Sequence, residues 1–179
     1  MLIRAVVLGS ALLTSAGGAI AADTTWNRNA AWLQEQIQNC AEGKGEYACR
    51  HFAARALHQL FAIDDYCKAD TCMQSHEIAA ELGKDSHWAI IGKANEQANL
   101  NQAQEMATGG LPVIAVQAGA DKGLIAIVMP GKLVPSQRWS RNVPLSVGTR
   151  LDKPEASVYD KGLNFLFSDP SKVTLYAYK

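Results

Sequence analysis

The stretch LPVIAVQAGADKGLIAIVMPG, residues 111–131, decides the fold that this sequence predicts. Its two ends, residues 111–117 and 123–129, are short apolar runs rich in valine and isoleucine, which favour β-strands. The residues between them, AGADKG, supply the glycine and aspartate that a turn requires. We therefore expect a buried hairpin on which the rest of the chain packs.

The chain after this hairpin is expected to consist mainly of strands. A proline-containing loop surrounds Trp139, and an apolar run near residues 163–167 predicts another strand. In the last run, residues 173–178, Val173 and its alternate neighbours are apolar while the residues between them are polar or aromatic. This alternation is typical of a closing strand with one buried face.

The chain before the hairpin is expected to be helical. Residues 26–40 have apolar side chains three to four positions apart, which indicates an amphipathic helix. Further helices are expected from Cys49 to about Phe61, from Ser75 to Leu82, as a turn after Ser86 around Trp88, and from Asn95 to the glycines at 109 and 110. Helices first and an antiparallel sheet second is the order of an α+β fold.

The first residues have the composition of a secretory signal peptide. Residues 1–4 form a short basic segment, residues 5–13 are apolar, and Ala19-Ile20-Ala21 is a small-residue cleavage pattern. We expect a signal peptide at 1–21, with cleavage after Ala21 or Ala22, and a single domain at 22–179. The mature protein is then exported, and is either periplasmic or secreted.

Charge and composition exclude several classes of partner. The chain has 17 basic and 17 acidic residues and no basic block, which disfavours nucleic acid as a partner. No segment has the length and hydropathy of an integral membrane span. The sequence shows no calcium-loop spacing, and Asp64-Asp65 is interpreted as a solvated turn rather than a carboxylate pair. We expect no cofactor and no metal.

Four cysteines, an even number, predict two disulfides in an oxidising compartment. Three pairings are open, and we favour Cys67–Cys72, which encloses a small loop, together with Cys40–Cys49. A zinc site formed by Cys67, Cys72 and His76 is a weaker interpretation of the same spacing.

Cys49 is also a candidate nucleophile. It is expected at the N-terminus of a helix, where the helix dipole favours a thiolate over a thiol. Such a thiolate still requires a base, which papain-like enzymes supply as a histidine on a strand that packs against the helix. The structural alternative is that Cys49 is a half-cystine.

Several motifs together resemble the NlpC-type, papain-fold cysteine amidases and endopeptidases of bacterial cell walls, most closely the CHAP-like and amidase-effector branches. The resemblance implies a papain-like α+β fold and a nucleophile at Cys49. It is carried by YACRHF at 47–52, the segment 75–82, Trp88, the glycines 109–110, VIA at 113–115, GLIAIV at 123–128, Pro130-Gly131 and Trp139.

The resemblance places Leu124 where the family has its catalytic histidine. Leucine cannot accept a proton, so the usual hydrolysis would be lost or reduced by orders of magnitude. His51 and His58 are expected on the helix of Cys49, at spacings that do not face it. His87 and His76 remain as weak candidate bases.

Three functions follow as hypotheses. The first is a catalytically degenerate cell-wall amidase-like domain that acts in binding or regulation, with peptidoglycan or a cell-wall-associated protein as its partner. The second is an active peptidoglycan amidase or endopeptidase that uses Cys49. The third is a disulfide-stapled periplasmic protein without enzymatic function.

Overall fold

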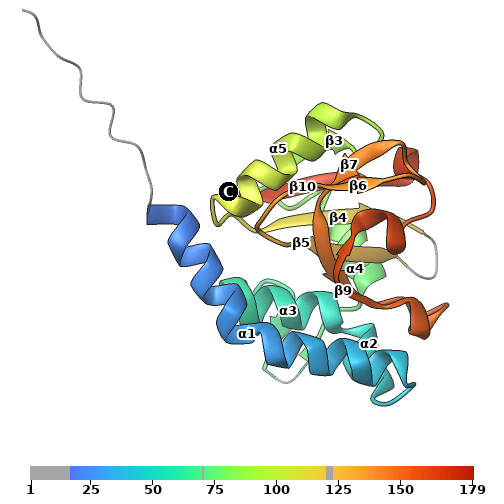
Figure 1. The fold of residues 1–179 in the computed structure, drawn as a ribbon. Helices are drawn as coiled ribbons and strands as arrows, with labels where there is room; N and C mark the ends of the chain where they lie inside the picture. The colour runs from blue at the N-terminus through green and yellow to red at the C-terminus, as the bar shows by residue number, and fades with distance from the viewer. Residues whose placement is uncertain (1–16, 70, 120–122) are drawn as a thin grey trace, which may run out of the picture.

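The computed structural model describes residues 17–69, 71–119 and 123–179, with side chains from Thr24 onward. The helices precede or flank one antiparallel sheet, so the α+β prediction is confirmed (Figure 1). The helices are α1 (Gly17–Ala41), α2 (Glu46–Arg50), α3 (Phe52–Phe61), α4 (Ser75–Glu81) and α5 (Gln97–Thr108).

The first sixteen residues lie outside the described part of the chain, and with them most of the predicted signal peptide. Helix α1 begins at Gly17 and runs through the predicted cleavage site, so its backbone is helical on both sides of Ala21. It contains the amphipathic helix that the sequence predicts at 26–40. Its buried residues Trp26, Leu33 and Ile37 form part of the core.

A six-stranded sheet in the order β3-β10-β4-β5-β8-β9 forms the centre of the fold, and all its neighbours are antiparallel. Its strands are β3 (Trp88–Lys93), β4 (Val113–Gln117), β5 (Leu124–Val128), β8 (Leu145–Gly148), β9 (Val158–Gly162) and β10 (Thr174–Tyr178). Two short hairpins pair β1 (Cys67–Lys68) with β2 (Thr71–Cys72) and β6 (Val134–Ser136) with β7 (Arg141–Val143).

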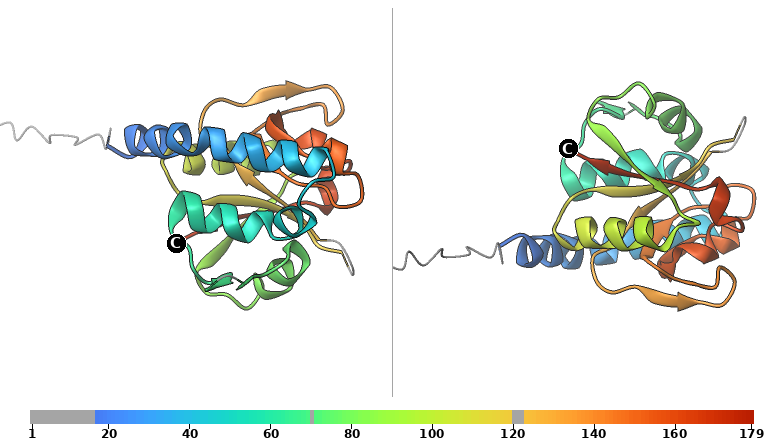
Figure 2. Two further views of the ribbon diagram at one scale, coloured as in Figure 1. Left: turned by 90° about the horizontal axis from the view of Figure 1, so that it is seen from below. Right: turned by 90° about the horizontal axis from the view of Figure 1, so that it is seen from above.

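The predicted hairpin is confirmed as β4 and β5, which pair with Ile114 opposite Ile127 and Val116 opposite Ile125. These four side chains lie on one face of the sheet, in a core shared with α1, α3 and α4. The other face packs against α5. Seen from below, α1 and α3 lie in front of the sheet, and from above α5 does (Figure 2).

The two core layers are built from alternate residues of the same strands. The layer under α1, α3 and α4 includes Phe52, Leu57, Ile78, Ile114, Ile125, Ile127 and Val147. The layer under α5 includes Leu100, Ala103, Val113, Ala115, Ala126, Leu163, Phe167 and Leu175. Because successive side chains of a strand point to opposite faces, an apolar strand can serve both layers.

Two sequence-based expectations about local structure are wrong. The residues around Trp88 form the edge strand β3 rather than a helical turn, because they pair with β10 at the end of the chain. The run near 163–167 is not a strand: it contains the 3₁₀ helix η2 (Leu163–Phe165), and the amide of Leu163 donates to the carbonyl of Pro144. Two further 3₁₀ helices are η1 (Pro154–Ala156) and η3 (Pro170–Lys172).

Gly123 lies where the start of β5 touches the start of α4. A Cβ at this position would lie 2.8 Å from the Cα of His76 and 3.2 Å from the carbonyl oxygen of Ser75, both backbone atoms. We expect Gly123→Ala to lower the free energy of unfolding by about 1–3 kcal/mol, as overpacking commonly does. Equilibrium denaturation in urea measures this change in the free energy of unfolding.

Gly83 provides the matched control, since nothing lies within 4 Å of the Cβ it would carry. Gly83→Ala should leave stability the same or raise it slightly, because alanine restricts the unfolded chain. Equal stability of the two variants would show that the contact between α4 and β5 relaxes at little cost.

Candidate functional site

Cys49 is joined to Cys40 by a disulfide, and Cys67 to Cys72 by another, as the favoured pairing predicts. Cys49 lies in the five-residue helix α2 and not at the start of the longer helix α3, which begins at Phe52, so the prediction that it opens this helix is wrong. The backbone breaks between the two helices at His51. In this oxidised form Cys49 has no thiol and is not a nucleophile.

Leu124 does not lie as the resemblance to cysteine amidases implies. Its side chain packs against the core layer of α5, whereas its neighbour Ile125 belongs to the layer of α3. It therefore points away from the sheet face that the helix after Cys49 covers. A histidine in place of Leu124 would start from this same face of the sheet, the one that packs against α5.

The two weak candidate bases are also placed elsewhere. Among the described residues, a cleft of about 280 Å³ beside Cys49 is lined without any histidine, by Cys40, Gly43, Glu46, Arg50, Arg150, Leu151 and Pro154. His76 lies in the first turn of α4, and the His87 Nδ1 atom lies 3.1 Å from Asp85 and 3.8 Å from Asp65. Within the described chain, the cleft beside Cys49 therefore contains no histidine that could act as the base of a papain-like dyad.

A larger cleft, of about 570 Å³, lies beside the β1–β2 hairpin, and we refer to it as the hairpin cleft. Its walls come from α1, α2, α3 and the hairpin with its disulfide. It is lined by Trp32, Tyr47, Arg55, His58, Gln59, Asp64, Cys67, Ala69 and Cys72. The lining thus combines aromatic rings with cationic, anionic and amide groups.

The side chains of the hairpin cleft are held by neighbours. The Trp32 ring stacks on the buried Phe52, with centroids 6.5 Å apart, and the Arg55 guanidinium lies 5.6 Å from the Trp32 centroid. Arg55 also donates to the Gln36 side-chain oxygen at 2.8 Å. Because these contacts fix the groups before a ligand arrives, less conformational entropy is lost on binding.

Two more clefts continue along the segment 64–74. One of about 420 Å³ shares Cys72 with the hairpin cleft and lies on the side of His51 and Tyr66. The other, of about 470 Å³, shares Asp65, Tyr66 and Met73 with the second. The second cleft therefore adjoins both the hairpin cleft and the third cleft.

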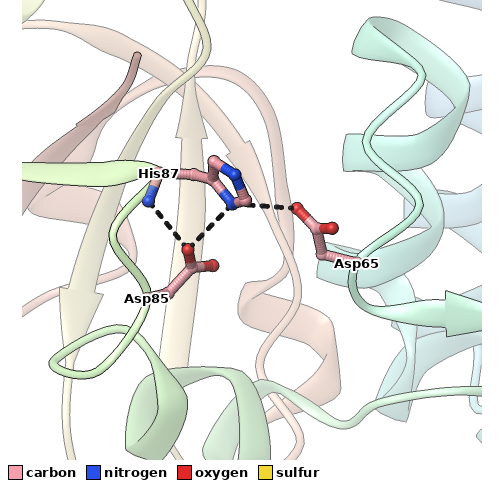
Figure 3. A group of neighbouring side chains, drawn as sticks. All are labelled: Asp65, Asp85 and His87. Carbon is pink, nitrogen blue, oxygen red and sulfur yellow. Dashed lines mark hydrogen bonds and ion pairs between the residues drawn. The ribbon is translucent and has the colours of Figure 1, made fainter.

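Asp65, Asp85 and His87 meet at the wall of this third cleft (Figure 3). The His87 Nδ1 atom lies 3.1 Å from Asp85 Oδ1 and 3.8 Å from Asp65 Oδ2. The backbone N–H of His87 donates to the same Asp85 oxygen at 2.9 Å. Two carboxylates and an imidazole are groups that ligate divalent metals.

Tyrosine hydroxyls hold both carboxylates. Tyr66, which is buried, donates to Asp85 Oδ2 at 2.9 Å, and Tyr178 donates to Asp65 Oδ2 at 3.0 Å. Burial, the hydrogen bond to Asp85 and the charge of Asp85 raise the pKa of Tyr66 well above its usual value. Burial and the Asp65 hydrogen bond raise the pKa of Tyr178 as well. Both hydroxyls therefore remain protonated donors at neutral pH.

Sequence reasoning missed this cluster. The sequence predicts a solvated turn at Asp64-Asp65, and it offers His87 only as a candidate base for Cys49. Asp85 and His87 are two residues apart, but Asp65 lies twenty positions earlier, so no spacing motif joins the three. Their only local signal is the pair Asp85 and His87 directly before a strand.

Comparison of the chain with protein-family models and with curated proteins gives no match. Within the described residues, no helix combines the length and the hydropathy that a membrane span requires. The two disulfides are consistent with export to an oxidising compartment.

Proposed function

We propose that this protein is an exported, non-catalytic binding module that binds a peptidoglycan stem peptide in the hairpin cleft. The observation that carries the proposal is the Cys40–Cys49 disulfide, which occupies the candidate nucleophile. Cysteine catalysis requires a thiolate and a base within hydrogen-bond reach. In the described, oxidised chain Cys49 is not a free thiol, and the lining of its cleft contains no histidine.

The hairpin cleft offers the chemistry that a short peptide requires. Arg55 suits a carboxylate, Asp64 suits an ammonium group, and Trp32 offers an apolar ring. A stem peptide carries both kinds of charge on a short backbone. The resemblance to cell-wall amidases supports this ligand class, and the placement of the binding groups away from Cys49 supports binding without cleavage.

The binding test is sedimentation of the oxidised protein with purified sacculi, followed by calorimetric titration with soluble stem peptides. We expect saturable binding that weakens at least about tenfold in Arg55→Ala, since hydrogen bonds to charged groups contribute about 1.5–3 kcal/mol. Arg138→Ala is the matched control. Arg138 is exposed, lies far from Arg55 in the sequence, and donates a hydrogen bond to the backbone carbonyl of Asn164. Equal affinity of the two variants, or no binding by the native protein, would contradict the proposal.

The same samples test the hypothesis that the protein is an active enzyme. Release of peptide fragments is measured by mass spectrometry with and without a thiol reductant. We expect none in either condition. Release that requires reduction and disappears in Cys49→Ala would instead assign the protein as a cysteine amidase or endopeptidase.

A further inference from the structure

We propose that Asp65, Asp85 and His87 form a binding site for one divalent transition-metal ion of the Zn²⁺ class, open to the adjoining cleft. The inference does not depend on the proposed peptide binding. It rests on donor geometry, on the hydrogen bonds that orient the donors, and on the charge of the cleft.

The three donor atoms already lie close to coordination distances. All are within 4.8 Å of one another, and two of the distances are 3.1 and 3.8 Å. Atoms that ligate one ion at about 2.0–2.2 Å are at most about 4.4 Å apart. An ion can therefore be accommodated with movements of the side chains alone.

The donor types select the class of ion. Ca²⁺ prefers six to eight oxygen ligands, whereas an imidazole nitrogen suits zinc and its neighbours among the transition metals. The site combines the Nδ1 atom of His87 with one oxygen from each of two carboxylates. This mixed nitrogen and oxygen set favours Zn²⁺ over Ca²⁺.

Groups outside the set orient each ligand. Tyr66 and Tyr178 donate to Asp85 and Asp65, and the Tyr178 ring stacks against the His87 ring with centroids 5.6 Å apart. Such partners fix the direction of metal ligands and commonly change metal affinity 10–100-fold. Asp85 is the least exposed of the three ligands, at 16% of its side chain, and it carries the most of these contacts.

The charge of the cleft also favours a cation. Two carboxylates lie within reach of one imidazole, and the third acidic residue of the cleft, Glu81, is paired with Lys84 at 3.1 Å. With three protein ligands, at least one position of a four-coordinate ion faces the cleft of about 470 Å³. Water or an anionic group from solution would occupy that position.

The experiment is calorimetric titration of the full-length, oxidised, chelator-treated protein with Zn²⁺ and separately with Ca²⁺. We expect one Zn²⁺ per chain and weaker binding of Ca²⁺. His87→Gln should weaken Zn²⁺ binding at least about 100-fold, because loss of a ligand exceeds the usual effect of an outer partner. His87 is 59% exposed at its side chain, so this variant should fold. Tyr178→Phe should keep the stoichiometry and weaken binding about tenfold.

His58→Gln is the matched control. His58 pairs with Asp64 in the same kind of exposed contact, but it has no second carboxylate among the described neighbours. Its substitution should leave Zn²⁺ binding unchanged. The inference is overturned if the native protein does not bind Zn²⁺, if Ca²⁺ binds as tightly, or if His58→Gln weakens binding as much as His87→Gln. Failure of peptide binding alone would leave the metal result intact, so the two proposals fail separately.

Discussion

Phe52→Ala is expected to lower the free energy of unfolding by about 3–5 kcal/mol. Phe52 is 1% exposed and lies at the start of α3 in the core layer beneath α1, α3 and α4. Truncation removes apolar contact and leaves a cavity that the surrounding helices fill only in part. Denaturation in guanidinium chloride, followed by far-ultraviolet circular dichroism, measures the loss.

The same substitution connects stability with the candidate site. Phe52 stacks on Trp32, a wall of the hairpin cleft, so Phe52→Ala should also weaken ligand binding there, whereas Phe52→Leu should retain more of both properties. Phe165→Ala is the control, because Phe165 is 56% exposed and its loss should change stability by less than about 0.5 kcal/mol. Similar losses of stability in Phe52→Ala and Phe165→Ala would mean that the Phe52 ring does not anchor α3.

The strongest predictions from sequence concern segments whose pattern is local. The hairpin of β4 and β5 follows from two valine- and isoleucine-rich runs around a turn, and the buried side of α1 follows from helical spacing. The disulfide pairing follows from the short loop that Cys67 and Cys72 enclose. In each case the residues that determine the structure lie within one element or its connection.

The errors arise where partners are distant in the chain. Trp88 lies in a strand because it pairs with Tyr178, ninety positions later, and no local pattern indicates that pairing. Leu124 could not be assigned to a face, since both sides of β5 are buried and apolar. A strand without alternation predicts burial but not direction.

The metal-ligand cluster was beyond sequence reasoning for the same reason. Asp65 follows α3, whereas Asp85 and His87 follow α4, and only the packing of these helices on the sheet brings the loops together. The hairpin cleft is likewise assembled from α1, α2, α3 and β1–β2. Such sites have no spacing rule, because each tertiary contact depends on the whole fold.

Replacement of both Cys40 and Cys49 by alanine is expected to lower the free energy of unfolding by about 2.7 kcal/mol. The disulfide closes a loop with a sequence separation of 9, and it restricts the unfolded chain accordingly. In thermal unfolding this corresponds to a decrease in Tm of roughly 5–11 °C for a chain of this size. Differential scanning calorimetry of the native and doubly substituted proteins measures it.

The double variant Cys67→Ala with Cys72→Ala is the control, with a smaller expected loss of about 2.2 kcal/mol because its separation is only 5. For ligand binding the order should be reversed, with a larger loss of affinity in the Cys67 and Cys72 variant than in the Cys40 and Cys49 variant. Cys67 and Cys72 line the hairpin cleft and should be required for full ligand affinity, whereas Cys40 and Cys49 do not line it. If replacement of Cys49 instead abolishes ligand binding while the free energy of unfolding is unchanged, Cys49 belongs to the functional site and does not serve as a structural half-cystine.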